Sequence, residues 1–333
     1  MPTNKEFQIC GLGNAIVDIF VEVSDAEFAA LGYERGTMRL IDLPDQKTLM
    51  KRFQAREPRL VSGGSVVNSV IAFAQLGGQA AFIGCVGDDR YGLFYAGEFE
   101  ELGIDVGNPV IIGEATGTCV AIITPDAERT MRTCLAVSSH LAARHVDEVR
   151  IKNSDWLFIE GYVFANPDTG QGAIRAAIAT AKQHGTKVAI TCSEAFIVDV
   201  FGGPFHEALA QADLLFCNET EACAVAKAPN AEAAFRKLKD VVPSVAVTDG
   251  SRGAYVRHDG VETHVPAFAC EPKDLTGAGD MFAGSFLYGI THAVPVEKAA
   301  RSACFLAMKV ITQVGARLHH GTKDFWVEGQ RGA

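Results

Sequence analysis

A glycine-rich turn close to the C-terminal end of the chain holds the residues best suited to chemistry. Residues 274–280 read Asp-Leu-Thr-Gly-Ala-Gly-Asp and run directly into an apolar, helix-like segment. A helix that opens on glycines leaves backbone N–H groups unpaired at the positive end of its dipole, and such a terminus binds phosphate well. The turn therefore predicts an anion site built from the backbone of Gly277, Ala278 and Gly279.

Asp280 lies at the edge of this turn, where a carboxylate has two explanations. A site that must deprotonate an attacking hydroxyl beside a transferring phosphoryl group needs such a base. Alternatively, Asp280 is an ordinary first-turn partner of the helix dipole, as any single Asp can be. The turn alone leaves both interpretations open.

The composition limits the class of protein. A chain of 333 residues can bury the core of one large α/β domain or of two smaller ones. A net charge of −10 argues against nucleic acid as a partner, although ATP remains compatible because local dipoles and a metal can outweigh the global charge. We find neither a signal peptide nor an apolar run of the length, about 18 residues, that a membrane span needs. We therefore expect a cytoplasmic protein that acts on a small molecule.

The nine cysteines are scattered, mostly inside apolar runs, and none forms a Cys-x-x-Cys pair. This spacing predicts neither a zinc site nor a redox dithiol. Buried free thiols in a reducing compartment are the simple explanation.

Short apolar strands alternate with longer helices along most of the chain, which indicates βαβ units and a mostly parallel sheet. The predicted strands are 7–12, 80–86, 156–159, 187–191, 214–217, 245–248 and 254–257, and the predicted helices are 66–76, 91–102, 171–184, 204–211, 231–241, 277–289 and 296–314.

Two strand-rich segments, 16–41 and 114–134, interrupt this rhythm. The second contains two apolar arms around Pro125, which is typical of a hairpin. We predict that both segments form one small β lid. The α/β core is then made of residues 1–15, 42–113 and 135–329.

The common nucleotide-binding loops are absent. Gly11-Leu12-Gly13 lacks the third small residue of a dinucleotide fingerprint because position 16 is Ile. The sequence contains no Gly-Lys pair for a Walker A loop, no His-Arg-Asp catalytic loop and no Gly-x-Ser-x-Gly elbow. If the protein handles ATP, the turn at 277–279 must therefore bind its phosphates.

A second glycine segment precedes another predicted helix. Residues 62–68 read Ser-Gly-Gly-Ser-Val-Val-Asn. Glycine lets a polyhydroxylated ligand approach the backbone, and an Asn amide offers a donor and an acceptor to adjacent hydroxyls. A helix cap explains the glycines equally well locally, but not why they accompany the C-terminal turn. The candidate acceptor-binding residues here are Gly63, Gly64, Ser65 and Asn68.

The two glycine segments, in this order and at this separation, resemble the paired signatures of the ribokinase (PfkB) family of carbohydrate and nucleoside kinases. Between them, 218–222 (Asn-Glu-Thr-Glu-Ala) and 247–254 resemble two further elements of that family. The resemblance covers roughly residues 7–320 and implies a ribokinase-like three-layer α/β/α sandwich with a mostly parallel sheet and a small β-sheet lid. The chain departs from the family pattern at Leu275, where Thr is usual, and at Ala136, where Gly-Ala is usual.

The resemblance also implies roles for single residues. Asp280 becomes the general base, Gly277, Ala278 and Gly279 the anion hole, and Arg129 a lid arginine that approaches the transferring phosphate. Mg²⁺ is expected near Glu221 and Asn218 through water, and a monovalent cation such as K⁺ near Asp274. The residues expected to bind ATP are Asn218, Thr248, Gly250, Gly253 and Thr276.

Asn14 and Asp18, four residues apart after the first strand, resemble the adenosine-kinase branch, in which the Asp grips the ribose hydroxyls. Residues 124–131 and 218–222 are closest to the same branch. This implies ATP-dependent phosphorylation of the 5′-hydroxymethyl group of a nucleoside, adenosine above others, with Met38, Tyr162 and Phe164 available for a purine slot. A sugar kinase for ribose, fructose or a deoxy-sugar acid and a non-catalytic nucleotide-binding regulator are the alternatives. The protein is expected to be a monomer or a homodimer that associates through the lid.

Overall fold

A nine-stranded sheet forms the centre of the larger part of the molecule in the computed structural model, which describes residues 5–107, 109–126 and 128–331. Neighbouring strands are parallel from β7 to β14, and β15 and β16 complete the sheet as an antiparallel pair. In spatial order the strands are β16 (Val261–Val265), β15 (Ala254–His258), β14 (Ser244–Thr248), β13 (Leu214–Asn218), β12 (Lys187–Thr191), β11 (Ser154–Glu160), β1 (Phe7–Leu12), β5 (Ala80–Ile83) and β7 (Asp105–Val106).

Helices cover both faces of this sheet because its strands are apolar on both sides. In β1, for example, Ile9 packs into the core on one face, while Cys10 and Leu12 pack into the core on the other. One face carries α3 (Ser65–Leu76), α4 (Arg90–Glu101), α10 (Ala278–Thr291), α11 (Val296–Ile311) and α12 (Thr322–Gln330). The other carries α5 (Glu148–Lys152), α6 (Gly170–Gln183), α7 (Ala195–Leu209), α8 (Glu219–Ala226) and α9 (Ala231–Leu238). The predicted three-layer α/β/α sandwich is confirmed.

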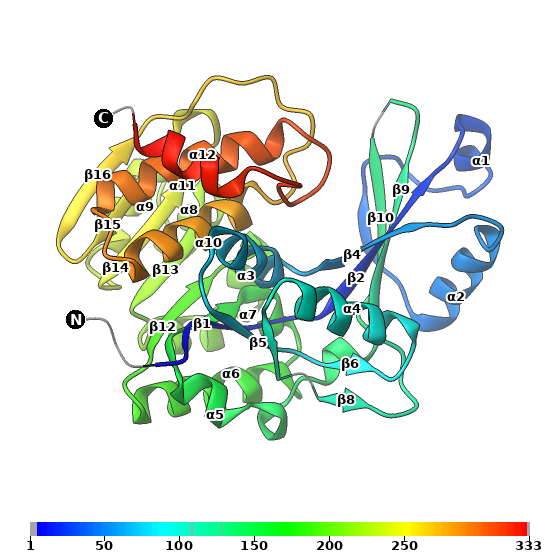
Figure 1. The fold of residues 1–333 in the computed structure, drawn as a ribbon, viewed down its shortest axis with the longest axis horizontal. Coiled ribbons are helices and arrows are strands. Elements are labelled where there is room, and N and C mark those ends of the chain that lie inside the picture. Colours follow the sequence, from blue (N-terminus) through cyan, green and yellow to red (C-terminus); the bar gives the residue numbers. More distant parts are fainter. Residues whose placement is uncertain (1–4, 108, 127, 332–333) are drawn as a thin grey trace.

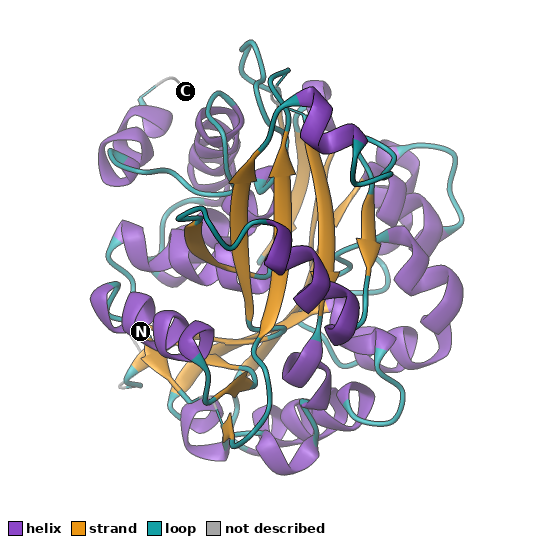
Figure 2. Ribbon diagram, turned by 90° about the vertical axis from the view of Figure 1, so that its right-hand side faces the viewer, coloured by secondary structure: helices purple, strands orange, loops and turns teal. Residues whose placement is uncertain are grey.

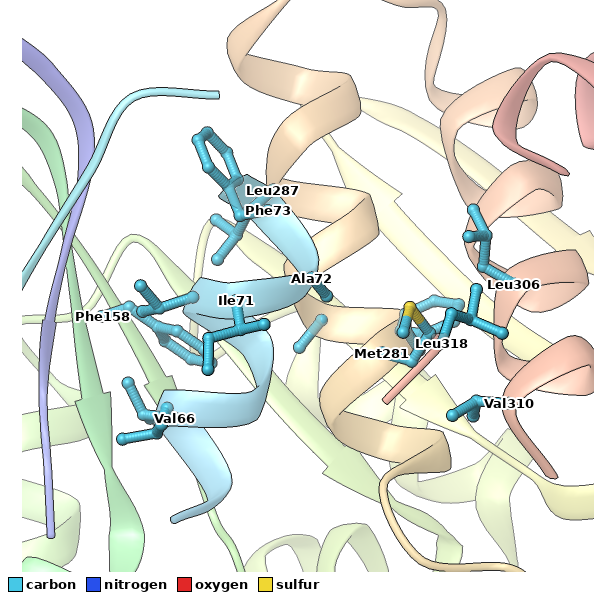
Figure 3. Packing of buried hydrophobic residues seen from close by; sticks show 14 of the residues in the cluster. Val66, Ile71, Ala72, Phe73, Phe158, Met281, Leu287, Leu306, Val310 and Leu318 are labelled. Atoms are coloured by element: carbon cyan, nitrogen blue, oxygen red, sulfur yellow. The ribbon is translucent and has the colours of Figure 1, made fainter. Parts of the chain in front are cut away.

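Helices α3 and α10 pack directly against each other, and this contact positions the candidate site. Val66 and Phe73 of α3 and Met281 and Leu287 of α10 belong to one buried cluster, seen in Figure 3. A Cβ atom at Gly284 of α10 would lie 2.1 Å from the Ser69 carbonyl oxygen of α3, so only glycine permits this approach. The first turns of two helices that are distant in the sequence are thereby held together.

A second, five-stranded sheet stands to one side of the α/β core, on the right in Figure 1 and facing the viewer in Figure 2. Helices α1 (Asp25–Ala29) and α2 (Leu43–Arg52) lie at the outer side of this sheet in Figure 1. Its strands, in spatial order, are β3 (Met38–Leu40), β10 (Arg129–Cys134), β9 (Gly117–Ile123), β2 (Ile16–Glu22) and β4 (Arg59–Gly63). A separate parallel pair joins β6 (Val86–Gly87) and β8 (Val110–Ile111).

Three of the differences from the predicted boundaries concern the small sheet, one strand and one helix. Strands β2, β3, β9 and β10 come from the two segments assigned to the lid, but β4 pairs antiparallel with β2, so residues 59–63 belong to the small sheet and not to the core range 42–113. The predicted strand 80–86 is two strands, separated at 84–85. The predicted helix 204–211 is the end of the longer α7, which is non-helical at Phe201, shortly before Pro204 removes a backbone donor.

None of the helices in the described part of the chain is both long and apolar enough to cross a membrane.

Candidate active site

The Asp280 carboxylate lies in the first turn of α10 and is held by two side chains from the first turn of α3. Ser65 Oγ donates to Asp280 Oδ1 over 2.7 Å, and Asn68 Nδ2 donates to Asp280 Oδ2 over 3.0 Å. Burial raises the pKa of Asp280 to about 6, although both hydrogen bonds and the positive charge of Arg317 act in the opposite direction. The structure therefore places a fixed, half-buried carboxylate where neutral pH still leaves it ionised.

The N-terminus of α10 is open beside this carboxylate. Gly277 adopts a left-handed φ of 80°, and no side chain caps the helix there. A Cβ atom at Gly277 would lie 2.5 Å from the Ala316 Cα, whereas a Cβ atom at Gly279 would meet nothing within 4 Å. The space beside Gly279 is thus open, while the Ala278 N–H donates to the Leu275 carbonyl oxygen over 3.4 Å. The anion hole stays a prediction.

Asp18 lies on β2 and reaches over the second glycine segment. A Cβ atom at Gly63 would lie 2.6 Å from Asp18 Oδ2, so the carboxylate sits directly against this backbone. Burial raises the pKa of Asp18 to about 6, against the positive charges of Arg317, Arg129 and Arg59. Both carboxylates, Asp18 and Asp280, therefore contact the same glycine segment, residues 62–68.

Arg129 crosses from the small sheet to the glycine turn. Its Nη2 lies 2.6 Å from Asp274 Oδ2, and its Nη1 donates to Thr276 Oγ1 over 3.4 Å. The Gly315 N–H donates to the same Asp274 oxygen over 2.7 Å. Arg129 is not a solvated charge at the tip of the hairpin, because its side chain is largely covered.

Asn218 and Glu221 form a reciprocal cap at the start of α8. The Asn218 amide donates to Glu221 Oε1 over 2.7 Å, and the Asn218 N–H donates to Glu221 Oε2 over 2.9 Å. Glu221 is buried, and this burial, helped by the charges of Glu194 and Asp280, raises its pKa to about 7. The carboxylate therefore has a local structural role, and it also feels the charge of Asp280.

The remaining residues predicted to bind ATP lie at the end of the next strand. Thr248 is the register partner of Asn218, so the two end neighbouring parallel strands side by side. Gly250 has a left-handed φ of 53° and open space where a side chain would project. Gly253 is enclosed instead: a Cβ atom there would lie 1.9 Å from the Val265 carbonyl oxygen, so this glycine shapes the turn into β15.

Asn14 is buried beneath the site rather than exposed in it. Its Nδ2 donates to Glu160 Oε1 over 2.7 Å, and its Oδ1 accepts from Ser138 Oγ over 3.1 Å. Glu160 also accepts from the Val66 N–H over 3.2 Å, which satisfies a donor at the start of α3. Burial raises the pKa of Glu160 to about 7. Asn14 thus joins β1 to the helix that carries Ser65 and Asn68.

A cavity of about 250 Å³ opens beside Asp18 and Asn68. Part of its lining is apolar, and part consists of Arg59, Gln75 and Arg317. The residues proposed for a purine slot do not line it: Phe164 is a core residue at 1% exposure, and Met38 lies half exposed on β3. Tyr162 does not line this cavity either, so the purine slot stays a prediction.

The site also contains charged residues that the sequence did not single out. Arg317 reaches Asn68, and Glu160 and Glu98 lie behind the glycine segment. A lone Arg in a loop, or a lone Glu at a strand end or within a helix, has no periodicity or spacing that could mark it. Ala136, one of the departures from the family pattern, has a left-handed φ of 43°, which explains why glycine suits that region.

Residues 37–321 match the family model described as "pfkB family carbohydrate kinase". The chain is 28% identical over 279 residues to the ribokinase of Haemophilus influenzae, covering 81% of this chain and 87% of that protein. It is 26% identical over 326 residues to the adenosine kinase of Saccharomyces cerevisiae, covering 91% and 94%. The solved structure of the adenosine kinase from Sinorhizobium meliloti superposes with a TM-score of 0.85 at 29% identity, covering 97% of this chain and 99% of that one.

The family match spans both glycine segments but begins after Asp18. The structural match covers 97% of the chain. The chain belongs to the pfkB family of carbohydrate kinases and is a phosphotransferase with an alcohol group as acceptor.

Proposed function

We propose that the protein is an ATP-dependent nucleoside kinase that phosphorylates the 5′-hydroxymethyl group of adenosine. The observation that carries this proposal is the arrangement of two carboxylates around one glycine segment. Asp280 is fixed by Ser65 and Asn68 at the open end of α10, and Asp18 lies against Gly63. One carboxylate can accept a proton while the other accepts hydrogen bonds from two neighbouring hydroxyls.

In the proposed reaction, Asp280 accepts the proton of the acceptor hydroxyl as that oxygen attacks the γ-phosphorus of ATP. The bond from the γ-phosphorus to the β,γ-bridging oxygen breaks, and ADP leaves with that oxygen. The backbone donors at Gly277, Ala278 and Gly279 stabilise the negative charge on the transferring group, with an effect of about 3–4 kcal/mol per well-placed donor in comparable sites. Arg129, already beside Thr276, is close enough to the turn to add a positive charge. Asp18 orients the ribose, and Asn218, Thr248 and Gly250 hold ATP.

The described residues fit Mg²⁺ held mainly through water. They contain no group of three or more His, Cys, Asp or Glu side chains arranged to hold a metal directly. Glu194 and Asp280 both raise the pKa of Glu221, so a cation near these carboxylates relieves their repulsion. Mg²⁺ bound there would offset the charge of the ATP phosphates, and Glu221 with Asn218 would orient its waters.

The surroundings of Asp274 fit a monovalent cation less well. The Arg129 guanidinium already balances this carboxylate, which also accepts from the N–H groups of Thr276 and Gly315. We therefore derive no step through such a cation.

A sugar kinase is the second candidate. Arg59, Gln75 and Arg317 give the cavity beside Asp18 polar groups that a bare sugar can use. The similarity to a ribokinase supports the same alternative. Adenosine is favoured because apolar side chains, including Leu60, Val61 and Ile71, line the same cavity as Asp18, and a purine can cover them.

A substrate panel tests the proposal. ADP release would be measured with ATP·Mg²⁺ and, in turn, adenosine, inosine, ribose and fructose, with the Asp280→Asn variant as a blank for adventitious kinase. We expect the highest kcat/KM for adenosine. A higher kcat/KM for ribose or fructose would replace the nucleoside proposal with the sugar kinase.

A further inference from the structure

Arg317 is a buried cation, and burying it does not by itself stabilise the fold. It follows α11 in the loop that passes under the glycine turn, and only 9% of its surface is exposed. Burial lowers its pKa, and within the described chain its Nη2 has no hydrogen-bond partner. Burying an incompletely paired guanidinium is costly, so this placement calls for a role beyond packing.

Two contacts fix the guanidinium. Its Nε donates to Asn68 Oδ1 over 3.3 Å, and its Nη1 donates to Glu98 Oε1 over 3.3 Å. Glu98 is itself anchored, because its other oxygen accepts from the Ser62 N–H over 2.8 Å. Arg317 therefore joins α4 and the loop after α11 to the first turn of α3.

The contact with Asn68 determines how that amide points. With its oxygen turned to Arg317, Asn68 must present its nitrogen to Asp280, and it does so over 3.0 Å. Without Arg317 the amide could flip and set its oxygen against the Asp280 carboxylate, where two acceptors repel each other. The chain Arg317–Asn68–Asp280 thus has one favourable orientation.

The charges around Asp280 also indicate a role for Arg317. Asp18 on β2, Glu160 on β11 and Glu221 on α8 each interact with it as like charges. Ser65 and Asn68 of α3 are neutral, and Arg317 is the cation whose charge lowers the pKa of Asp280. The same cation lowers the pKa of Asp18.

We infer that Arg317 is a positioning residue of the kinase: through Asn68 it holds the Asp280 carboxylate in its proton-accepting orientation. Arg317 also lines the cavity beside Asp18, so KM for the acceptor, measured in the same variants, separates positioning from direct contact. The inference rests on the proposed role of Asp280 as the base.

The test compares Arg317→Met, which keeps the bulk of the side chain, with Arg317→Lys, which keeps its charge. For Arg317→Met we expect kcat to fall about 10- to 100-fold, the usual worth of one charge-assisted contact, with KM for ATP little changed. The acid limb of the kcat–pH profile should move to higher pH. Arg317→Lys should leave that limb in place and still lower kcat, because an ammonium group cannot reach Asn68 and Glu98 with the same fork.

Two further variants separate positioning from structural support. Arg301→Met removes another partly buried arginine, which packs over Phe268, and should keep the wild-type kcat and pH profile. Glu98→Gln removes the anchor but leaves the charge on Arg317, so its acid limb should not move upward. Circular dichroism and thermal melting check the fold of each variant, and if Arg317→Met does not fold, Arg317→Lys decides the question by its kcat.

A wild-type kcat and acid limb in folded Arg317→Met, or a wild-type kcat in Arg317→Lys, would overturn the inference. Failure of the proposed function looks different: Asp280→Asn would then be active as well. An inactive Asp280→Asn together with a fully active Arg317→Met leaves the proposed function intact and removes only the role of Arg317.

Discussion

Replacing Asp280 with asparagine removes one negative charge from the first turn of α10 and preserves its shape. The asparagine oxygen can still accept from Asn68 Nδ2, and the new amide can donate to Ser65 Oγ, so the contacts of 3.0 and 2.7 Å both have a counterpart. Only the capacity to accept a proton is lost. A positioned general base contributes about 10²–10⁴-fold in rate, which corresponds to about 2.7–5.4 kcal/mol of activation free energy.

The assay is ADP release with saturating adenosine and ATP between pH 5 and 9. Burial raises the pKa of Asp280 to about 6, and the base must be ionised, so wild-type kcat should rise as the pH increases through about 6 and then level off. The asparagine variant should lack this limb and retain less than about a hundredth of the wild-type kcat, with an unchanged KM for ATP.

A matched control addresses the alternative that Asp280 is only a dipole partner. Asp324 also lies in the first turn of a helix, α12, and is exposed. Asp324→Asn should cost at most about 1 kcal/mol of stability and leave kcat unchanged. If Asp280→Asn keeps more than about a tenth of the wild-type kcat, Asp280 is not the base and the reasoning fails.

Three further predictions follow from the same geometry. Asp18→Ala should raise KM for the nucleoside about 10- to 100-fold, because hydrogen bonds to a charged group contribute roughly 1.5–3 kcal/mol, while KM for ATP stays the same; an unchanged nucleoside KM in folded protein would make Asp18 a core residue. Adenosine with an ATP analogue should slow amide hydrogen exchange in β2, β9 and β10 more than in β11–β13, as a closing lid requires, and protection confined to the large sheet would refute the lid. The raised pKa values of Asp280 and Glu221, about 6 and about 7, mean that the folded protein binds more protons than the unfolded chain between roughly pH 4 and 7, so its free energy of unfolding should fall as the pH rises through that window. Asp280→Asn should accordingly raise Tm more at pH 8 than at pH 5, and an equal or opposite change in thermal melting would contradict this sign.

The sequence predicted the residues whose spacing carries a mechanism. The turn at 277–279 predicts an anion site with Asp280 as its candidate base, and residues 62–68 form the second glycine segment. The structure brings Asp280 to Ser65 and Asn68 of that segment. The layer architecture was also predictable, because short apolar strands alternate with long helices. The predicted helix starts and the layer architecture agree with the structure because helix termini and the alternation of strands and helices are determined by sequence patterns over a few residues.

What the sequence could not give depends on contacts between distant segments. Strand β4 reads as a short, partly polar stretch and becomes a strand only because β2 supplies its partner. Arg317 acquires its meaning from Asn68 and Glu98, which lie 249 and 219 residues away. The enclosure of Gly253 by the Val265 carbonyl depends equally on how the antiparallel strands β15 and β16 meet.

The position of the transferred phosphate tests the central claim most directly. The protein would be incubated with ATP·Mg²⁺ and either adenosine or 5′-deoxyadenosine, and the products identified by phosphorus NMR and mass spectrometry. With Asp18 on the ribose and Asp280 beside the hydroxymethyl oxygen, adenosine should yield only the 5′-monophosphate, and 5′-deoxyadenosine should yield none. Phosphate on a ring hydroxyl, turnover of 5′-deoxyadenosine, or no nucleoside product beside rapid phosphorylation of ribose would contradict the account.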